Sequence, residues 1–318
     1  YMGNAMINRF TEQDQFSFIA NANNINQQGS TARGNSVRSG RARSGNGNGI
    51  TSSNTFGVNT ANILSSKVKM GGNVTYNYSD NYSNSKEFRQ NLTDKNKTYR
   101  TSTSLDREYS NNISFDGKLE YRPDSVTTII FTPSLSYNWS SSHSTSHKMT
   151  QKSITDTALV NNIDASNTLR SDGLNVRMQL DISRKLSAAG RRVSFSTWFS
   201  SNNSNGDGTN KSEQIYYNKP ENNTTLDQQS HTTGDRSAYN FRLTYVEPLG
   251  KGNFINFSYN IQVNDTKNRK QTFDYDPIED DYTILNSRFS KSSDTKTINH
   301  NFRANFNSNK EKYAYNIG

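Results

Sequence analysis

Apolar and polar residues alternate along much of this chain, with the period of two that a β-strand with one covered face requires. The clearest segment covers residues 111–121. One face of it carries Ile113, Phe115, Gly117, Leu119 and Tyr121, and the other carries Asn112, Ser114, Asp116, Lys118 and Glu120. Because the first face has no charged residue, the segment is predicted to be a strand with one apolar and one polar face.

Further segments repeat this alternation. They cover residues 16–22, 74–78, 129–139, 174–182, 193–199, 239–245, 255–263 and 298–306, with weaker copies near 1–10 and 56–64. The chain has about twelve strand candidates, each near the roughly 9–11 residues that a tilted membrane strand needs. Pro133 cannot donate to a ladder and predicts a bulge or a local break. Trp198 falls on the polar face of its segment.

The connections between these segments are of two kinds. Short turns are predicted near Glu12, Ser66, Asp124, Ala189, Gly250 and Asn309. Between them lie Ser/Asn/Gly-rich loops of about thirty residues, which are uncommon in compact soluble domains. Short turns at one end, long loops at the other and aromatic residues at the strand ends are typical of outer-membrane barrels. We therefore predict an all-β fold: a transmembrane antiparallel up-and-down β-barrel with short periplasmic turns and long extracellular loops.

Composition agrees with a barrel better than with a conventional core. Only 30% of the 318 residues are hydrophobic and the mean hydropathy is -0.97, whereas ordinary soluble domains are roughly 45–50% apolar. Yet 17 Tyr, 16 Phe and 2 Trp are more aromatic residues than a disordered chain carries. A barrel in lipid needs an apolar outward face only, while its lumen stays polar and wet. The absence of Cys decides little.

Complete barrels of this kind begin and end on the periplasmic side. With the short turns placed there, residues 1–10 run inward from the cell exterior, and the last segment stops after a few residues. We therefore expect residues 1–318 to be part of one β-barrel domain, truncated at both ends and containing neither a plug nor a signal peptide.

Several short motifs resemble those of one family. They are Asn8-Arg9-Phe10 followed by residues 16–24 (FSFIANANN), Gly49-Ile50-Thr51 leading to Phe56-Gly57-Val58-Asn59, Tyr121-Arg122-Pro123-Asp124 with residues 131–137 (FTPSLSY), and residues 245–250 (YVEPLG). Together they resemble the TonB-dependent-receptor-like outer-membrane β-barrel proteins. The resemblance implies a barrel of about 22 strands, an N-terminal plug in its lumen, and energy supplied by the periplasmic partner TonB.

Acidic residues crowd one predicted loop. They are Asp274, Asp276, Glu279, Asp280 and Asp281, and Tyr275 and Tyr282 lie among them. Oxygen ligands at this density are candidates for a calcium site, although they lack the spacing of the twelve-residue calcium loop. The alternative is a solvated acidic loop at the pore mouth.

Two histidines are a second candidate for a metal site. His143 and His147 stand four residues apart, and on a helix this spacing would let both side chains bind one metal ion. The Ser-rich surroundings form helices poorly and favour a solvated loop instead. His231 is isolated, and His300 falls on the apolar face of its segment, where an interfacial position is expected.

The chain has a net charge of +9, but its sequence contains no nucleic-acid recognition motif. Nucleic acid is therefore not expected as a partner. Four arginines punctuate a Gly/Ser-rich stretch: Arg33, Arg38, Arg41 and Arg43. The stretch lacks the Gly-Lys-Ser/Thr ending of a phosphate loop. On an outer loop these arginines are candidates for pairing with lipopolysaccharide phosphates; a flexible basic loop without a fixed partner is the alternative.

The sequence shows no Ser, His and Asp in the order of a catalytic triad, no Cys nucleophile and no close carboxylate pair on a predictable scaffold. We therefore expect no enzyme and no cofactor. The leading hypothesis is an integral outer-membrane transport protein of a Gram-negative bacterium, in contact with membrane lipid and lipopolysaccharide. TonB and a surface lipoprotein are its candidate protein partners. A non-transporting barrel subunit of a surface or secretion complex is the second hypothesis, and a soluble secreted β-sandwich or adhesin is the third.

Overall fold

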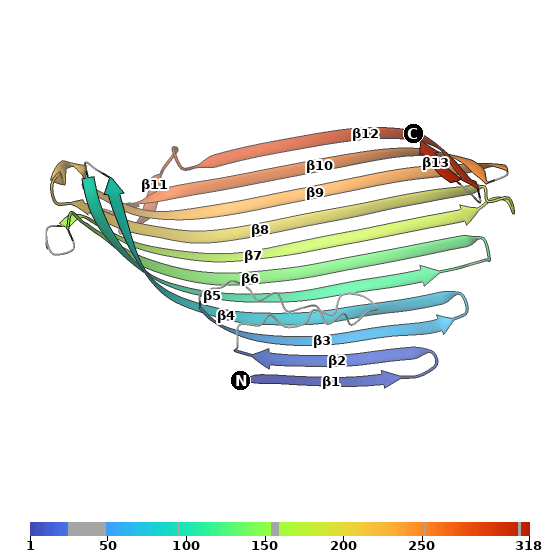
Figure 1. The fold of residues 1–318 in the computed structure, drawn as a ribbon, viewed down its shortest axis with the longest axis horizontal. Helices are drawn as coiled ribbons and strands as arrows, with labels where there is room; N and C mark the ends of the chain where they lie inside the picture. The colour runs from blue at the N-terminus through green and yellow to red at the C-terminus, as the bar shows by residue number, and fades with distance from the viewer. Residues whose placement is uncertain (25–48, 94–95, 154–158, 251, 311–312) are drawn as a thin grey trace.

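The computed structural model describes residues 1–24, 49–93, 96–153, 159–250, 252–310 and 313–318. In these residues thirteen strands form one antiparallel sheet in which consecutive strands pair, except that β12 pairs with β10 while β11 forms a short side branch on β10 (Figure 1). The strands are β1 (Met2–Phe10), β2 (Asp14–Asn23), β3 (Ile50–Ser65), β4 (Val68–Thr93), β5 (Asn96–Tyr121), β6 (Thr127–Gln151), β7 (Leu159–Lys185), β8 (Arg192–Tyr216), β9 (Thr224–Gly250), β10 (Asn253–Asp276), β11 (Asp281–Leu285), β12 (Lys291–Lys310) and β13 (Tyr313–Ile317). The predicted all-β, antiparallel, up-and-down arrangement is confirmed.

The strands are much longer than the sequence pattern predicted. Strands β4 to β10 contain 24–27 residues each, about 80–90 Å at ~3.3 Å per residue. The predicted short turns fall between consecutive strands at one end of the sheet. At the other end, most residues assigned to long loops continue the ladders, and only a 3-10 turn, η1 (Pro220–Asn222), interrupts the β8–β9 connection. Strands of 9–11 residues joined by loops of about thirty were thus a wrong expectation for these hairpins.

The registers align the apolar faces of neighbouring strands. Phe115 of β5 lies opposite Val74 of β4 and Leu135 of β6, and Leu135 lies opposite Val176 of β7. The same alignment continues through Phe195, Leu243, Tyr259 and Phe302 to β12. The resulting apolar band is about nine residues wide along each strand, about 30 Å, since directly opposed residues of antiparallel strands share a face.

This apolar band is not covered by other protein in the described part of the chain. Phe115 is 40% exposed and Phe257 is 41% exposed, and the one buried hydrophobic side chain among the described residues is Ala238. Most buried side chains are polar, for example Asn240 and Thr272. The sheet is therefore a single layer, and its apolar face requires a covering that the described residues do not provide.

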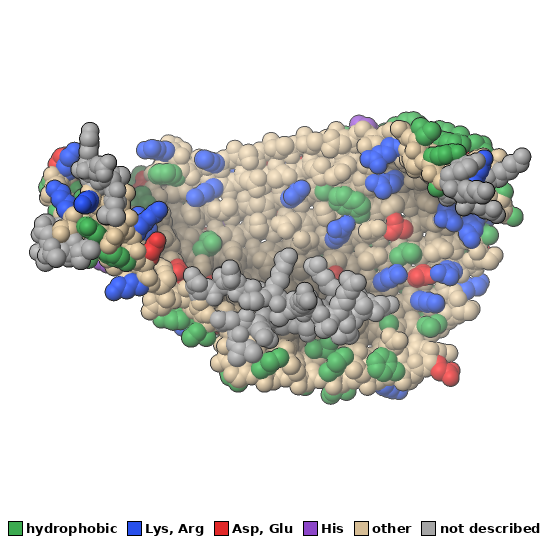
Figure 2. Space-filling model, viewed as in Figure 1, with side chains coloured by type: hydrophobic (Ala, Val, Ile, Leu, Met, Phe, Trp, Pro, Cys, Tyr) green, Lys and Arg blue, Asp and Glu red, His purple; other side chains and the backbone are tan. Residues whose placement is uncertain are grey.

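The opposite face is polar and hollowed (Figure 2). Its side chains include Asn112, Ser114, Asp116 and Lys118, which line a cavity of about 900 Å³ near the short-turn end. The predicted division of the 111–121 segment into an apolar and a polar face is confirmed. In Figure 2 this face is mostly neutral and polar, with Lys and Arg scattered over it.

Pro133 breaks the ladder locally without shifting it. The β5–β6 pairs resume in the same register on either side, with Asp116 opposite Ser134 and Leu119 opposite Phe131. Gly117 lies opposite the ring of Pro133. A Cβ atom at Gly117 would stand 3.0 Å from Pro133 Cγ. The predicted local break is therefore present, but the structure has no bulge there, because a residue without a side chain accommodates the ring.

The two margins of the sheet are formed by strands from the two ends of the described chain. The strand order ends at β1 on one side and at β12 with the short β13 on the other, and these lie at opposite margins of the sheet. No helix in the described residues has the length and apolar character needed to cross a membrane.

Candidate functional site

A tryptophan lies on the polar face of the sheet. Trp198 lies on this face, opposite Gln179 of β7 and Asn240 of β9. The guanidinium carbon of Arg177 stands 5.7 Å from the centre of the indole ring, within the range of a cation–π contact. The structure thus accounts for the tryptophan on a polar face, which the alternation alone did not explain.

Hydrogen bonds within and between strands hold the side chains of the hollow in place. Asp181 accepts from Gln179 Nε2 at 2.8 Å and from Ser196 Oγ at 2.6 Å. Asn240 Nδ2 donates to Asn260 Oδ1 at 2.8 Å. Because the donors and acceptors are amides, hydroxyls and carboxylates, the hollow offers a hydrated surface that matches polar solutes.

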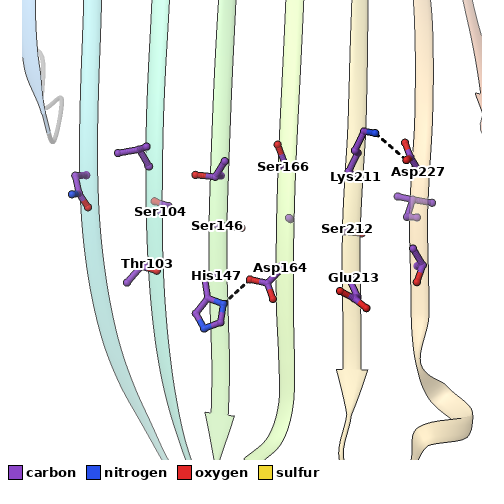
Figure 3. Close-up of a pocket in the computed structure, with 16 residues that line it drawn as sticks. Thr103, Ser104, Ser146, His147, Asp164, Ser166, Lys211, Ser212, Glu213 and Asp227 are labelled. Atoms are coloured by element: carbon purple, nitrogen blue, oxygen red, sulfur yellow. Dashed lines mark hydrogen bonds and ion pairs between the residues drawn. The ribbon is translucent and has the colours of Figure 1, made fainter. Parts of the chain in front are cut away.

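A second candidate site is a groove of about 770 Å³ across β4 to β9 (Figure 3). Two rows of opposed residues line it. One is Thr103, His147, Asp164, Glu213 and Thr225, and the other is Leu105, Thr145, Ser166, Lys211 and Asp227. Ser166 is eight residues from Leu174 on the same strand, and an even separation places both on one face. The groove therefore lies on the apolar-band face, beyond the band.

A histidine–carboxylate hydrogen bond and an ion pair cross this groove (Figure 3). His147 Nδ1 is 2.6 Å from Asp164 Oδ1, and Lys211 Nζ is 3.0 Å from Asp227 Oδ2. Glu213 lies beside Asp164 in the register, and its side chain has no hydrogen-bond or ion-pair partner among the described residues. The groove thus combines two paired carboxylates, Asp164 and Asp227, with Glu213, which has no such partner among the described residues.

Two tyrosines lie beside the groove beyond β9 and are linked to its lining through Asp227. The hydroxyl of Tyr282 donates to Asp227 Oδ1 at 2.6 Å, and the Tyr275 and Tyr282 rings pack edge to face at 5.6 Å. Burial, followed by the hydrogen bond to Asp227, raises the pKa of Tyr282. Hydrogen bonds to Tyr282 and Asp227 raise the pKa of Lys211. At neutral pH the tyrosine is therefore neutral and the lysine charged, which preserves the contact.

The acidic residues named as calcium candidates do not converge. Asp274 accepts from Gln228 and Asn286 at 2.7 and 2.8 Å, and Asp276 accepts from the Ile278 amide at 2.9 Å. Asp280 accepts from the Tyr275 hydroxyl, Asp281 from the Tyr282 amide, and Glu279 lies in the turn between β10 and β11. No set of three His, Cys, Asp or Glu residues able to hold a metal ion occurs in the described part of the chain.

The histidine and arginine candidates from the sequence lie in different parts of the chain. His143 and His147 lie in β6, where the sequence favoured a loop; that interpretation was wrong, because the Ser-rich segment pairs with β5 and β7. His231 pairs with Asp207 at 2.6 Å, and His300 contacts the Tyr259 hydroxyl at 2.9 Å. The arginines Arg33, Arg38, Arg41 and Arg43 lie outside the described residues.

Sequence reasoning missed the groove because its residues were assigned to loops. Groove residues such as Lys211 and Glu213, or Asp164 and Ser166, follow the same period of two as the apolar band. That polar alternation was a usable signal for strands. The pairing of His147 with Asp164, however, depends on the register of two long strands and is not local information.

Comparison with known proteins gives no independent assignment. No protein-family model matches the chain, and a search of curated proteins finds no match.

Proposed function

We propose that this chain forms part of the wall of an integral outer-membrane β-barrel that transports a polar solute. The observation that carries the proposal is the continuous, partly exposed apolar band on one face of a sheet whose other face is polar and hollowed. At a strand tilt of about 40°, a band of about 30 Å along the strand corresponds to about 23 Å of height, close to the apolar band of outer-membrane barrels.

Aromatic rings at the band margins support the same proposal. Trp139 packs 5.5 Å from Tyr137 and 6.4 Å from Tyr76, and Phe199 packs 5.0 Å from Tyr239. These residues lie at the margin of the band that is farther from the short turns, where a girdle at a membrane interface is expected. Tyr121 and Tyr245 occupy the other margin.

The polar hollow supports transport over a purely structural role. Its hydrogen-bonding side chains suit passage of a hydrated solute, and the resemblance to TonB-dependent-receptor-like proteins would add a plug and energy from TonB. Lipopolysaccharide and a surface lipoprotein are further partners under this proposal. The alternative is a non-transporting barrel subunit of a surface or secretion complex. It is favoured by the paired strand segments beyond the band, which offer a firm surface to another protein.

Site-directed spin labelling tests the membrane proposal. The chain has no Cys, so Phe115→Cys and Ser114→Cys each introduce one labelling site. In native outer membranes, the label at position 115 should collide mainly with oxygen, which concentrates in hydrocarbon. The label at position 114 should collide mainly with a water-soluble nickel chelate. Equal accessibility of both labels to the nickel chelate would contradict the proposal.

A transport assay separates the two functions. Under the transport proposal, vesicles containing the purified protein take up small polar solutes, and deletion of the gene causes a solute-specific growth defect. Stoichiometric copurification of other proteins, with neither uptake nor a growth defect, would select the structural alternative instead.

A further inference from the structure

The strands continue as paired ladders well past the apolar band. We call the polar part of the sheet beyond the band the extension; it comprises residues 79–93, 96–110, 140–151, 159–173, 200–216, 224–238 and 264–276. The β7–β8 ladder runs to Asn161 opposite Tyr216 without a register shift. Each strand therefore projects about 40–55 Å further as regular β-structure.

The groove lies on the outward face of this extension. Ser166 is eight residues beyond Leu174, the last apolar residue of the β7 band, which is about 26 Å along the strand. If the proposed function holds, this face looks sideways from the barrel into the layer just outside the membrane. The groove is then accessible from outside the barrel, and a ligand reaches it without entering the lumen.

The lining favours an uncharged ligand rich in hydroxyl groups. Hydroxyl side chains lie among charged and titratable ones, and Lys211 and His147 already have carboxylate partners. A polyanion would face Asp164, Glu213 and Asp227 with little uncompensated positive charge. A ligand with many hydroxyls can both donate to Glu213 and accept from the Ser and Thr hydroxyls.

The tyrosine pair adds an apolar contact at one end. Tyr282 is anchored by its hydrogen bond to Asp227, and Tyr275 packs against its ring. Aromatic rings attract the weakly positive edges of other groups to their faces, and the carbon-bound hydrogens of a sugar ring are such an edge. Polar groups that fix orientation beside aromatic surface are the usual construction of a small-ligand site.

We propose that this outward groove binds a neutral oligosaccharide, with Glu213 as a hydrogen-bond acceptor and Tyr282 as a stacking surface. The position of the groove in the layer outside the membrane rests on the proposed function, whereas its ligand chemistry rests on the lining residues alone. The sugar chain can be free or can belong to a membrane lipid, because both present the same hydroxyl-rich surface.

The test is calorimetric titration of the full-length protein in detergent with maltohexaose, cellohexaose and mannohexaose. Smooth and rough lipopolysaccharide, with and without the outer sugar chain, form a second arm. Binding of a free hexasaccharide assigns a soluble ligand; binding of smooth but not rough lipopolysaccharide assigns the lipid-linked chain. Glu213→Gln should weaken either interaction about ten-fold, because it replaces a charge-assisted hydrogen bond. Ser166→Tyr should block the groove sterically.

The matched control is Glu108→Gln, an exposed carboxylate in the extension on the opposite face of β5. This variant should bind like the unmodified protein. Absence of binding to every saccharide and lipopolysaccharide, or an equal loss in Glu108→Gln and Glu213→Gln, overturns the proposal. A protein partner that is lost in Glu213→Gln, without any glycan binding, overturns it in favour of protein recognition.

The spin-label measurement at positions 114 and 115 separates this proposal from the membrane proposal. Glycan binding that depends on Glu213, in a protein without the membrane accessibility pattern, refutes the membrane location and leaves the groove assignment standing. The membrane pattern without glycan binding refutes the groove assignment alone.

Discussion

At the residue scale, the two tryptophans of the chain occupy opposite faces of the sheet. Trp139 lies on the apolar band beside Tyr137, whereas Trp198 lies in the polar hollow beside Arg177. The same side chain is therefore expected in two solvents, lipid at one position and water at the other.

Tryptophan fluorescence makes this difference measurable. In a Trp198→Phe variant reconstituted with brominated lipid, we expect strong quenching of Trp139 and weak quenching by aqueous iodide. In Trp139→Phe, Trp198 should show the reverse pattern, because its ring faces the hollow. The same quenching profile for both variants would show that the two faces do not contact different solvents.

A short turn offers a pH prediction at the same scale. Hydrogen bonds from the Thr127 hydroxyl, at 3.1 Å, and from the backbone amides of Val126 and Thr127 lower the pKa of Asp124. A carboxyl whose pKa is lower in the folded state stabilises that state above its unfolded pKa of about 3.9. This stabilisation is lost as the pH falls through the folded pKa.

Accordingly, Asp124→Ala should lower the thermal midpoint by a few degrees at pH 7, and the difference should shrink progressively below about pH 4. Gel mobility of heated and unheated protein at each pH measures this. Ser125→Ala, in the same turn, is the control and should leave the midpoint unchanged. A difference that stays constant down to pH 2 would rule out the charged carboxylate as its cause.

At the element scale, the long strands explain how a Ser/Asn-rich sequence forms regular structure. Strand pairing uses backbone groups, and small hydroxyl side chains add cross-strand hydrogen bonds. Three examples measure 2.8 Å each, namely Ser79 with Ser110, Ser85 with Ser104, and Ser140 with Ser171. Low hydrophobicity therefore does not prevent a segment from being a strand when both neighbours are present.

Resistance to protease follows from this pairing. Arg170 and Lys211 lie within the β7–β8 ladder of the extension, so trypsin should cut the native protein at these sites far more slowly than the denatured protein. Peptide mapping over a time course measures the two rates. Rapid native cleavage at both sites would restore the long flexible loops that the sequence pattern predicted.

At the scale of the whole molecule, the sheet places an apolar band on one face and a polar hollow on the other. The band and the groove lie on the same face of the sheet at different positions along the strands. The energetic cost of a charge on that face should therefore depend on its position along the strand. Phe115 lies within the band, and Leu105 lies in the extension ten residues away on the same face of β5.

Matched arginine substitutions test this dependence on height. We expect Phe115→Arg to lower the free energy of unfolding in lipid vesicles by about 2–4 kcal/mol, and Leu105→Arg by about 0–1 kcal/mol. Denaturant titration monitored by fluorescence measures both. Equal costs at the two positions would mean that the band does not contact hydrocarbon.

The sequence by itself determined the strand type, the up-and-down order, the short turns and the two faces of each strand. This information is local, because a period of two and a turn residue are read within one segment. The tertiary structure decided the length of the strands and the position of Trp198 beside Arg177. It also brought His147, Asp164 and Glu213 together in the groove. Those features depend on cross-strand register, in which residues far apart in sequence become neighbours through backbone pairing.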